Sequence, residues 1–284
     1  MLIRQYKIKF LNKLKDEFPP EEATSFFNIL LKFYLGLERI DLALDPSKVL
    51  TVAEEQIMDE ALNKLFQHIP IQYITGEKEF FGSTFRVNKH VLIPRPETED
   101  LVQWITDDLD PSQHIAVNIL DIGTGSGCIA ISLAKNFPQA AVTALDVSEE
   151  ALKIAKENVI LNETTVNFIQ VDVLQLGSLK DKYDVIVSNP PYVRELEKEA
   201  MHKNVLDHEP ALALYVKDND PLIFYKKITK LAEMGLNPGG KLYFEINQNL
   251  GEQTLEIVKS AGFEAELRKD IFGNNRMIRG IKKQ

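Results

Sequence analysis

The sequence predicts an α/β protein in which a small helical domain precedes a doubly wound, mostly parallel sheet with an antiparallel edge strand. Three observations predict this class: helical periodicity over residues 1–75, short β-rich pieces joined by turns over 76–95, and alternating strands and helices over 96–284. We therefore expect a helical domain, a linking β-hairpin and an α/β domain with these boundaries.

Helical signals dominate the first 75 residues. In "EEATSFFNILLKFYLGL", Phe26, Leu30 and Phe33 recur at helical spacing, and the glycine near the end of the segment can stop the helix. Further along the chain, Thr51 and Glu54 form a T-x-x-E capping box before a second apolar periodic stretch. Strand signals are few before residue 76, so we expect a small domain made of helices.

Strands and helices alternate in the rest of the chain. This alternation is typical of a parallel sheet that is covered by helices on both faces and binds ligands at the carboxyl ends of its strands. The last two β-rich pieces are separated only by a turn, so we expect them to pair antiparallel. The predicted strands, in order, are "VNILDIG", "AAVTALD", "VNFIQVD", "YDVIVSN", "GKLYFEI", "FEAELRKD" and "NRMIRGIKK".

Composition and charge exclude several classes of protein. The 284 residues are 44% hydrophobic and carry a formal net charge of −9, which disfavours extensive non-specific binding to nucleic acid. Cys128 is the single cysteine, which rules out an internal disulfide and fits a reducing cytoplasm. No apolar run reaches the roughly 20 residues of a membrane-spanning helix, and the basic amino terminus lacks the continuous apolar stretch of a secretory signal. We expect a soluble cytoplasmic protein.

A glycine-rich loop joins the first strand of the sheet to the helix after it. In "LDIGTGSGCIAISLA", Gly123, Gly125 and Gly127 lack the Cβ atoms that would keep a ligand away from the backbone. The dinucleotide fingerprint G-x-G-x-x-G requires glycine where Cys128 stands, which disfavours a nicotinamide dehydrogenase and leaves a ligand with an adenosine but no pyrophosphate. The alternative is a tight turn without a ligand, although three alternating glycines exceed what such a turn needs.

Two aspartates stand at the ends of the next two strands. Asp146 is placed to accept hydrogen bonds from ribose hydroxyls. Asp172 is placed to accept the adenine amino group, with Val173 packing against the ring. Alternatively, each aspartate caps the helix that follows it. Strand end, spacing and glycine loop together favour the functional interpretation for Asp146, whereas both interpretations stay open for Asp172.

The fourth strand of the sheet stops abruptly at Asn189-Pro190-Pro191-Tyr192. The prolines fix two φ angles, so the carbonyl of Pro190 has a fixed direction and converges with the side-chain carbonyl of Asn189. Two such acceptors could orient a planar NH2 group for methyl transfer from S-adenosylmethionine lying over the glycine loop, while Tyr192 stacks on the acceptor or walls the pocket. The alternative is a rigid exit turn in which Asn189 binds local backbone groups.

Two histidines, His202 and His208, follow this corner. No acidic cluster with ligand spacing accompanies them, so we expect no metal site. Cys128 follows the glycine loop on an apolar helix, where we expect a small buried side chain and not a nucleophile.

In this chain, "DIGTGSG", Asp146 and "NPPY" resemble the motifs of class I S-adenosylmethionine-dependent methyltransferases that modify planar NH2 groups. Upstream, "PIQYITGEKEFFGSTFRV" and "VLIPRPETE" are similar to the HemK (PrmC) family, the peptide chain release factor N5-glutamine methyltransferases. The resemblance covers nearly the whole chain, including "HEPALAL" at 208–214 and "DIFGNNR" at 270–276. It implies a seven-stranded, Rossmann-like methyltransferase sheet behind a helical domain that recognises the substrate.

The resemblance also implies the reaction, which is transfer of a methyl group to the side-chain amide of the glutamine in the Gly-Gly-Gln loop of class 1 release factors. S-adenosylhomocysteine would be the product, and no metal would take part. Asn189, Pro190, Pro191 and Tyr192 would hold the glutamine amide, with Asn189, Pro190 and Tyr192 as the catalytic residues. The implied cofactor-binding residues are Gly123, Thr124, Gly125, Ser126, Gly127, Asp146, Asp172, Val173 and Asn189.

Two further parts of the chain bear on the resemblance. Arg95, Glu97 and Thr98 of "PRPETE" are implied to shape the active-site entrance. After the fifth strand the family often has E-I-G-x-x-Q-G, whereas "EINQNLG" carries Asn247 and Leu250 at the glycine and glutamine positions. This departure leaves the local turn and its contacts open.

Three other functions stay open. An N6-adenine methyltransferase of nucleic acid is disfavoured by the acidic charge and by the lack of an obvious target-recognition domain after "NPPY". A glutamine methyltransferase of a ribosomal protein is disfavoured by "PRPETE", since that enzyme's equivalent segment differs. A non-catalytic binding protein on the same scaffold would be marked by loss of a glycine or of Asn189, and neither is lost.

Overall fold

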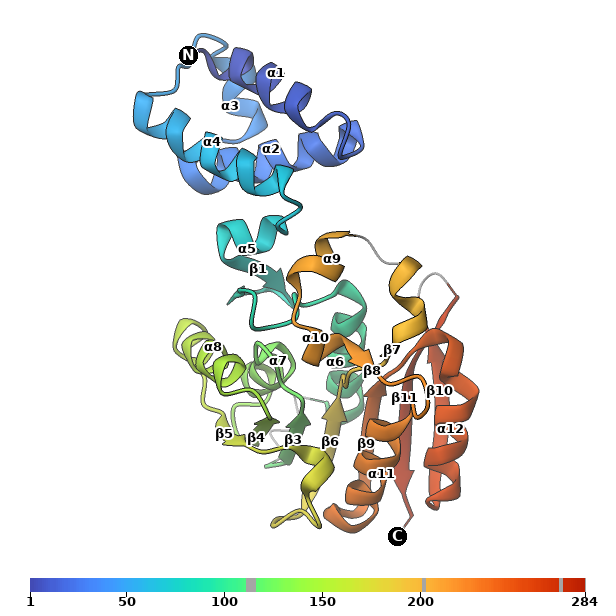
Figure 1. The fold of residues 1–284 in the computed structure, drawn as a ribbon. Coiled ribbons are helices and arrows are strands. Elements are labelled where there is room, and N and C mark those ends of the chain that lie inside the picture. Colours follow the sequence, from blue (N-terminus) through green and yellow to red (C-terminus); the bar gives the residue numbers. More distant parts are fainter. Residues whose placement is uncertain (111–115, 201–202, 271–272, 284) are drawn as a thin grey trace. The chain divides into compact units, whose positions relative to one another are not determined.

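The computed structural model describes residues 1–110, 116–200, 203–270 and 273–283, which form two compact units (Figure 1). The first unit comprises Met1–Gly76 together with a short later helix, and the second comprises the remaining described residues. Three residues of the segments singled out from the sequence, His202, Ile271 and Phe272, lie outside the described residues.

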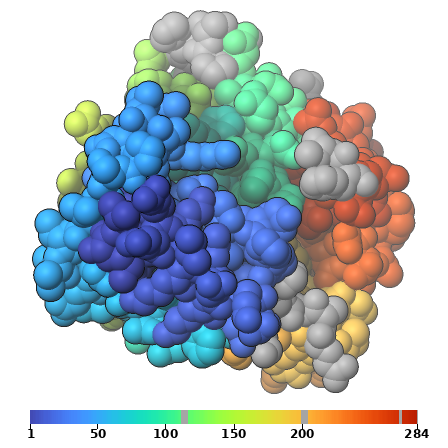
Figure 2. Space-filling view, turned by 90° about the horizontal axis from the view of Figure 1, so that it is seen from above, coloured from blue at the N-terminus to red at the C-terminus, as the bar shows by residue number. Residues whose placement is uncertain are grey.

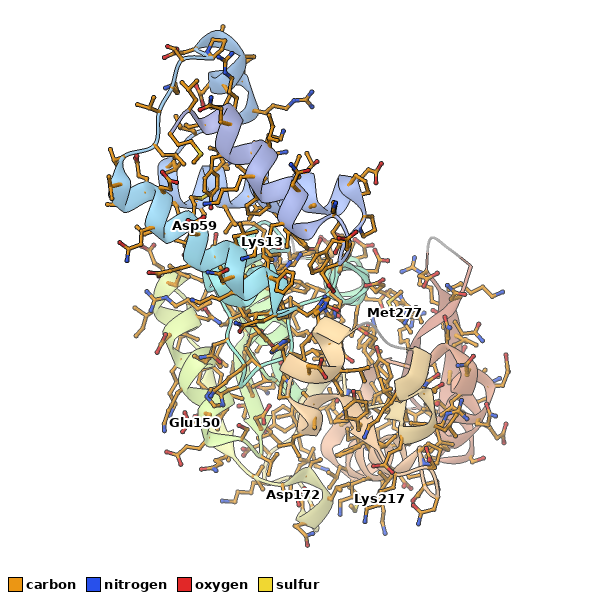
Figure 3. The ribbon with its side chains drawn as sticks, turned by 45° about the horizontal axis from the view of Figure 1, so that its top comes forward. Lys13, Asp59, Glu150, Asp172, Lys217 and Met277 are labelled. Atoms are coloured by element: carbon orange, nitrogen blue, oxygen red, sulfur yellow. The ribbon has the colours of Figure 1, made fainter. Side chains whose placement is uncertain are left out.

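The first unit is a set of helices around one apolar core, and its residues 1–76 are coloured blue to cyan in the space-filling view (Figure 2). The expected capping box is confirmed, because the amide of Glu54 donates to Thr51 Oγ1 at 3.2 Å and the amide of Thr51 donates to Glu54 Oε2 at 2.7 Å. Polar contacts join the first and fourth helices: Lys9 Nζ donates to Asp59 Oδ1 at 2.8 Å, and Lys13 Nζ donates to Asn63 Oδ1 at 2.7 Å. Lys13 and Asp59 are labelled in Figure 3. The helices are α1 (Ile3–Leu14), α2 (Pro20–Leu35), α3 (Arg39–Leu44), α4 (Val52–Phe66), α5 (Ile71–Thr75) and α9 (Lys203–His208).

The buried face of α2 differs slightly from the one that the spacing predicts. Phe27 and Leu30 are fully buried, whereas Phe26 is only partly buried and Phe33 is 43% exposed. The buried face of α2 therefore includes Phe27 instead of Phe26, and Leu31 is buried beside Leu30.

A short hairpin, β1 (Glu77–Phe80) and β2 (Ser83–Arg86), opens the second unit. Its phenylalanines Phe80 and Phe85 are buried in the core of that unit and pack edge to face. A buried asparagine of the following domain, Asn158, also binds the hairpin: its side chain accepts from the amide of Arg86 at 2.6 Å and donates to the carbonyl of Arg86 at 3.0 Å. The expected hairpin is present, and its contacts make it part of the second unit.

The main sheet has seven strands within the described residues, in the order β10-β11-β9-β6-β3-β4-β5. The pairs β9-β6, β6-β3, β3-β4 and β4-β5 are parallel, which confirms the predicted fold class. One placement differs from the expectation. The antiparallel strand is β11, which lies one place in from the edge and pairs antiparallel with both β9 and β10, so the edge strand β10 runs with the parallel set. The strands are β3 (Asn118–Ile122), β4 (Ala141–Asp146), β5 (Asn167–Gln170), β6 (Tyr183–Ser188), β9 (Leu236–Glu245), β10 (Phe263–Lys269) and β11 (Asn275–Lys282).

The central strands are buried on both faces, which explains their continuous apolar runs. In β6, Val185 and Val187 belong to one core, which also includes residues of α6 and α7, while Ile186 belongs to a second core with α11. No helix among the described residues is long and apolar enough to span a membrane. The helices of this unit are α6 (Pro96–Leu109), α7 (Cys128–Asn136), α8 (Glu149–Leu161), α10 (Ala211–Leu214), α11 (Ile223–Gly235) and α12 (Gly251–Ser260).

Short elements complete the second unit. A two-stranded parallel pair lies outside the main sheet, and 3₁₀ turns follow several of the strands. These elements are β7 (Val193–Arg194), β8 (Tyr215–Val216), η2 (Val173–Gln175), η3 (Glu195–Ala200) and η4 (Gln248–Leu250).

Candidate active site

A cavity of about 330 Å³ opens at the carboxyl ends of β3, β4 and β6 in the second unit. This is the position at which a doubly wound sheet presents ligands, because the loops leaving adjacent parallel strands meet there. Asp172, labelled in Figure 3, lies in the loop after β5 and also lines the cavity. The lining brings together most of the residues that the sequence predicted: Gly123, Thr124, Gly125, Ser126, Asp146, Asp172, Val173, Asn189, Pro190 and Pro191.

The glycines of the loop after β3 have two different functions. All three have positive φ angles, of 76°, 55° and 82°, which residues other than glycine rarely adopt. A Cβ atom at Gly123 or Gly125 would meet no protein atom within 4 Å, so these two leave open space beside the cavity that they line. Gly127 does not line the cavity, and a Cβ atom there would lie 2.9 Å from Ile131 and 3.2 Å from Ala155. Gly127 therefore allows close packing of α7 and α8, and we assign it no direct ligand contact.

The glycine loop is bound to the end of β4. The amides of Gly123 and Thr124 donate to the carbonyl of Leu145 at 2.8 and 2.9 Å, and the amide of Gly125 donates to Asp146 Oδ2 at 2.8 Å. Asp146 Oδ1 accepts from the amide of Ser148 at 2.9 Å. Asp146 is therefore both a local cap and a cavity residue, and each of its oxygens keeps a second lone pair for a ligand hydroxyl.

A second, fully buried carboxyl lies beneath this loop. Asp121 Oδ2 accepts from the hydroxyl of Thr124 at 2.6 Å. Burial raises the pKa of Asp121 to about 7; the Thr124 hydrogen bond lowers it, and the charge of Asp146 adds to the rise. Burial also raises the pKa of Asp146. The loop is thus built over two carboxyl groups whose pKa values are both raised by burial.

Asp172 caps the 3₁₀ turn that follows it, since its Oδ1 accepts from the amide of Leu174 at 2.9 Å. The capping alternative considered from the sequence is therefore present, and it coexists with a place in the cavity wall beside Val173. One carboxylate oxygen of Asp172 has no hydrogen bond to another group in the described part of the chain. This oxygen is available to a ligand.

The Asn-Pro-Pro corner faces the glycine loop across the cavity. Ser188, the last residue of β6, donates its hydroxyl to the carbonyl of Ile122 at 2.6 Å and so joins the corner to the start of the glycine loop. Within the described ranges, the side chain of Asn189 has no hydrogen bond to a local backbone group. Its side-chain NH2 donates to Thr98 Oγ1 of α6 at 3.3 Å, across 91 residues of sequence. This contact to a distant helix differs from the local backbone contacts that a simple exit turn would give Asn189.

Glu245, at the end of β9, is a buried carboxyl group of the site and was not identified from the sequence. It is 1% exposed and lies opposite Met277 of β11, which Figure 3 labels. Its Oε2 accepts from the hydroxyl of Thr98 at 2.6 Å, and its Oε1 accepts from the hydroxyl of Tyr192 at 3.1 Å. Burial raises the pKa of Glu245, while these two hydrogen bonds and the charge of Arg276 oppose the rise.

Tyr192 lies behind the cavity wall. It is not among the residues that line the cavity, and its hydroxyl donates to Glu245. Burial and the Glu245 charge raise the pKa of Tyr192 far above its ordinary value, so the phenol is a hydrogen-bond donor and not a base. The structure gives Tyr192 a supporting contact with Glu245, and its expected stacking on an acceptor stays a prediction.

The "PRPETE" and "HEPALAL" segments meet through one ion pair. Arg95 Nη2 lies 2.6 Å from Glu209 Oε1, and the amide of Ile93 donates to Glu209 Oε2 at 3.3 Å. The Glu209 side chain is only 1% exposed. Arg95 and Thr98 line the cavity, whereas Glu97 does not. The sequence did not show that Glu209 is buried or that Arg95 pairs with it.

The turn that departs from the family pattern has its own contacts. Asn247 Nδ2 donates to the carbonyl of Tyr192 and to Glu197 Oε2, both at 3.0 Å. Glu197 also accepts from Arg194 and Asn249. Burial raises the pKa of Glu197, but the hydrogen bonds from Arg194, Asn249 and Asn247 outweigh it and lower the pKa to about 2. Asn247 therefore connects the end of β9 to the segment that follows the corner.

No group of three or more metal-ligating side chains occurs among the described residues. His208 contacts the carbonyl of Gln67 through Nε2 at 2.9 Å. Cys128 is buried at the start of α7, and burial raises the pKa of its thiol to about 12, which suits the structural role expected from the sequence.

Two family models match the chain: the methyltransferase small domain over residues 101–213 and the PrmC N-terminal domain over residues 3–76. Two relatives cover nearly its whole length. A release factor glutamine methyltransferase of Flavobacterium psychrophilum is 51% identical over 98% of this chain and 99% of that protein. A protein of the same name from Bacteroides thetaiotaomicron is 45% identical over 93% of this chain and 95% of that protein.

Among solved structures, a methyltransferase from Pyrococcus furiosus matches with a TM-score of 0.53 at 19% identity. The match covers 82% of this chain and 100% of that one. A likeness at this level of identity shows a shared fold.

Proposed function

The chain belongs to the release factor glutamine methyltransferase family, and we propose that it methylates the side-chain amide nitrogen (N5) of the glutamine in the Gly-Gly-Gln loop of class 1 release factors, with S-adenosylmethionine as the methyl donor. One observation of the structure carries the proposal. The same cavity is lined by the glycine loop and two aspartates on one side and by Asn189, Pro190 and Pro191 on the other. A methyl donor and an amide acceptor would therefore face each other.

The residues of the donor side suit S-adenosylmethionine. Gly123 and Gly125 leave space for a ligand next to the backbone, and Asp146 has lone pairs available to ribose hydroxyls. Asp172 and Val173 offer a hydrogen-bond acceptor and an apolar surface to the adenine. When bound, this cofactor supplies an electrophilic methyl group on a sulfonium, and S-adenosylhomocysteine is the product. The proposal needs no metal.

On the acceptor side, Asn189 Oδ1 and the carbonyl of Pro190 would accept the two hydrogens of the glutamine NH2. An amide nitrogen is a poor nucleophile because its lone pair is delocalised, so holding both hydrogens aims the nitrogen and favours its pyramidal form. Methyl transfer would form the N–C bond and break the S–C bond, and the N-protonated amide that results is acidic enough to lose one proton to water. Positioning supplies much of the rate, because the site needs no strong base. In this proposal Tyr192 supports the corner through Glu245.

The proposal extends to the helical unit and to the place of action. The segment of residues 1–75 matches the PrmC N-terminal domain model over residues 3–76, and we assign it the recognition of the release factor. The cytoplasmic location that the single cysteine predicts suits a substrate of the translation machinery.

The test is incubation of the purified protein with methyl-labelled S-adenosylmethionine and, separately, a class 1 release factor, a large-subunit ribosomal protein and DNA. We expect label on the release factor alone, with none on a release factor whose Gly-Gly-Gln glutamine is replaced by alanine. Label on DNA or on the ribosomal protein, with none on the release factor, would overturn the proposal.

A further inference from the structure

In the proposed function, the side-chain amide of Asn189 has to direct its oxygen, and not its NH2 group, toward the cavity. Its oxygen and its NH2 group are nearly equal in size, so shape alone does not choose between the two orientations. With Oδ1 toward the cavity, Asn189 accepts a hydrogen from the substrate amide. Turned by 180°, it would present its own NH2 to the substrate NH2, and the two donors would repel each other. Something in the protein must therefore fix the orientation.

The hydrogen-bond chain behind Asn189 supplies that constraint. Thr98 is 2% exposed and lies between Asn189 Nδ2, at 3.3 Å, and Glu245 Oε2, at 2.6 Å. The hydroxyl of Thr98 donates its single hydrogen to Glu245 Oε2. The oxygen of Thr98 is then left with lone pairs alone. It can bind only a donor, and the only donor on the side chain of Asn189 is its NH2 group.

Glu245 anchors the corner at both ends. It fixes Asn189 through Thr98, and its other oxygen accepts from the hydroxyl of Tyr192 at 3.1 Å. Both oxygens of the buried carboxyl group therefore accept hydrogen bonds, one from Thr98, which itself binds Asn189, and one from Tyr192.

We propose that Glu245 and Thr98 are positioning residues that orient the amide of Asn189 with its carbonyl oxygen toward the substrate. Neither residue transfers a group or a proton. The inference rests on the proposed function for its substrate, but the orientation of Asn189 belongs to the protein without any ligand. In this proposal, Thr98 of α6 and Glu245 of β9 are needed for methyl transfer although neither contacts the substrate.

Thr98→Val is the direct test, because it keeps the shape of the side chain and removes the hydroxyl. We expect kcat for methyl transfer to the release factor to fall on the order of 10²-fold, since a misplaced catalytic group costs about that much. The KM for the release factor and the Kd for S-adenosylmethionine should stay within about 3-fold. Thr98→Ser restores the hydroxyl and should recover kcat to within about 3-fold of the wild type.

A matched control lies on the same helix. Thr106 is also buried in α6, but its hydroxyl donates to the carbonyl of Val102, one turn earlier, at 2.8 Å. Thr106→Val therefore removes a buried hydroxyl without touching the corner, and its kcat should stay within about 2-fold of the wild type. A fall equal to that of Thr98→Val would show that loss of any buried hydroxyl in α6 lowers activity, and it would overturn the proposal.

Glu245→Gln separates the proposal from a general loss of stability. Glutamine keeps the size of the side chain but has one acceptor oxygen and one NH2 donor, so it cannot accept from the hydroxyls of Thr98 and Tyr192 on separate oxygens. We expect kcat to fall again while cofactor binding is retained. If both residues act through the orientation of Asn189, the double variant Thr98→Val/Glu245→Gln should be no slower than the slower single variant. Multiplied losses in kcat would contradict a common path.

A measurement without substrate distinguishes this inference from the proposed function. In 15N-labelled protein, the side-chain NH2 signal of Asn189 can be assigned by its absence from Asn189→Ala. We expect the signal to move in Thr98→Val and Glu245→Gln and to stay in place in Thr98→Ser and Thr106→Val. An unmoved signal in Glu245→Gln would overturn the inference even if Thr98→Val does not fold. If the Asn189 signal moves as expected but the release factor receives no methyl label in the transfer assay, only the proposed function is overturned.

Discussion

The two sides of the cavity are constructed in different ways. On the donor side, hydrogen bonds that shape the site join residues close in sequence, such as Asp146 and Ser148, 2 residues apart, and Gly125 and Asp146, 21 residues apart. On the acceptor side, Asn189 and Thr98 are 91 residues apart, and Thr98 and Glu245 are 147 apart. The donor side is therefore a local motif, whereas the acceptor side exists only once α6, β6 and β9 have packed together.

This difference suggests how each side fails. A local loop loses ligand contacts when one of its own residues changes, and the rest of the site stays in place. A corner held by distant partners loses its orientation when a partner that never touches the ligand changes. The following predictions separate the two kinds of failure.

The largest effect is expected at the corner itself. Asn189→Ala removes the acceptor that orients the substrate amide, so kcat should fall about 10³-fold or more. The Kd for S-adenosylmethionine should stay within a few-fold, because the glycine loop and Asp146 do not depend on Asn189. Calorimetric titration of the cofactor beside single-turnover methyl transfer checks both parts. Turnover close to that of the wild type would show that the corner is structural.

On the donor side, the buried carboxyl of Asp121 should make stability depend on pH. Its pKa is about 7 in the folded protein and 3.8 ordinarily, so folding favours the protonated form. The contribution of protonated Asp121 to the free energy of unfolding is fully present below pH 3.8. It is lost as the pH rises to about 7, and the free energy of unfolding falls by at most about 4 kcal/mol. The free energy of unfolding in urea, measured from pH 4 to 7.5 without cofactor, should fall more steeply in the wild type than in Asp121→Asn. Parallel pH profiles would refute this assignment.

The two strand-end aspartates should differ in their importance for the cofactor. Asp146→Ala removes two backbone hydrogen bonds to a charged group and a ligand acceptor, so the Kd for S-adenosylmethionine should rise about 30-fold. Asp172→Ala removes only the cap of a 3₁₀ turn and one ligand contact, and its Kd should rise less than 10-fold. Cofactor titration of the two variants compares them directly. A larger effect at Asp172 would reverse their proposed roles.

The smallest effect is expected where the chain departs from the family pattern. Asn247→Gly introduces the family's usual residue and removes the hydrogen bonds to Tyr192 and Glu197. The free energy of unfolding should fall by about 1 kcal/mol, and kcat should stay within about 3-fold, because Glu245 still binds both ends of the corner. Urea unfolding and initial rates test this. A loss of kcat as large as that of Thr98→Val would place Asn247 in the positioning network.

The predictability of the site follows the same division. The glycine loop, Asp146, Asp172 and the Asn-Pro-Pro corner were identified from the sequence because each combines a residue type with a place at the end of a strand. Gly127 was grouped with the other two glycines, yet it packs α7 against α8, and a sequence does not show which glycines face a ligand and which face a helix. Glu245 was missed because an acidic residue at the end of an apolar strand gives no sign of its partners.

The fold shows the same pattern. The alternation of apolar runs and helical stretches predicted the parallel sheet, since strands buried on both faces must be apolar throughout. It did not predict that β11 would insert between β9 and β10, because the turn between the last two strands fixes their antiparallel pairing but not which of them joins β9.

The sequence by itself determined the residues that are able to do the chemistry: glycines that a ligand can approach, carboxylates at strand ends and a rigid pair of prolines after Asn189. These depend on backbone freedom, charge and ring geometry, which are properties of the residues themselves. Only the tertiary structure decided the direction in which Asn189 points. That direction depends on a hydroxyl from α6 and a buried carboxylate from β9, which hydrogen-bond only when strands and helices distant in sequence pack side by side.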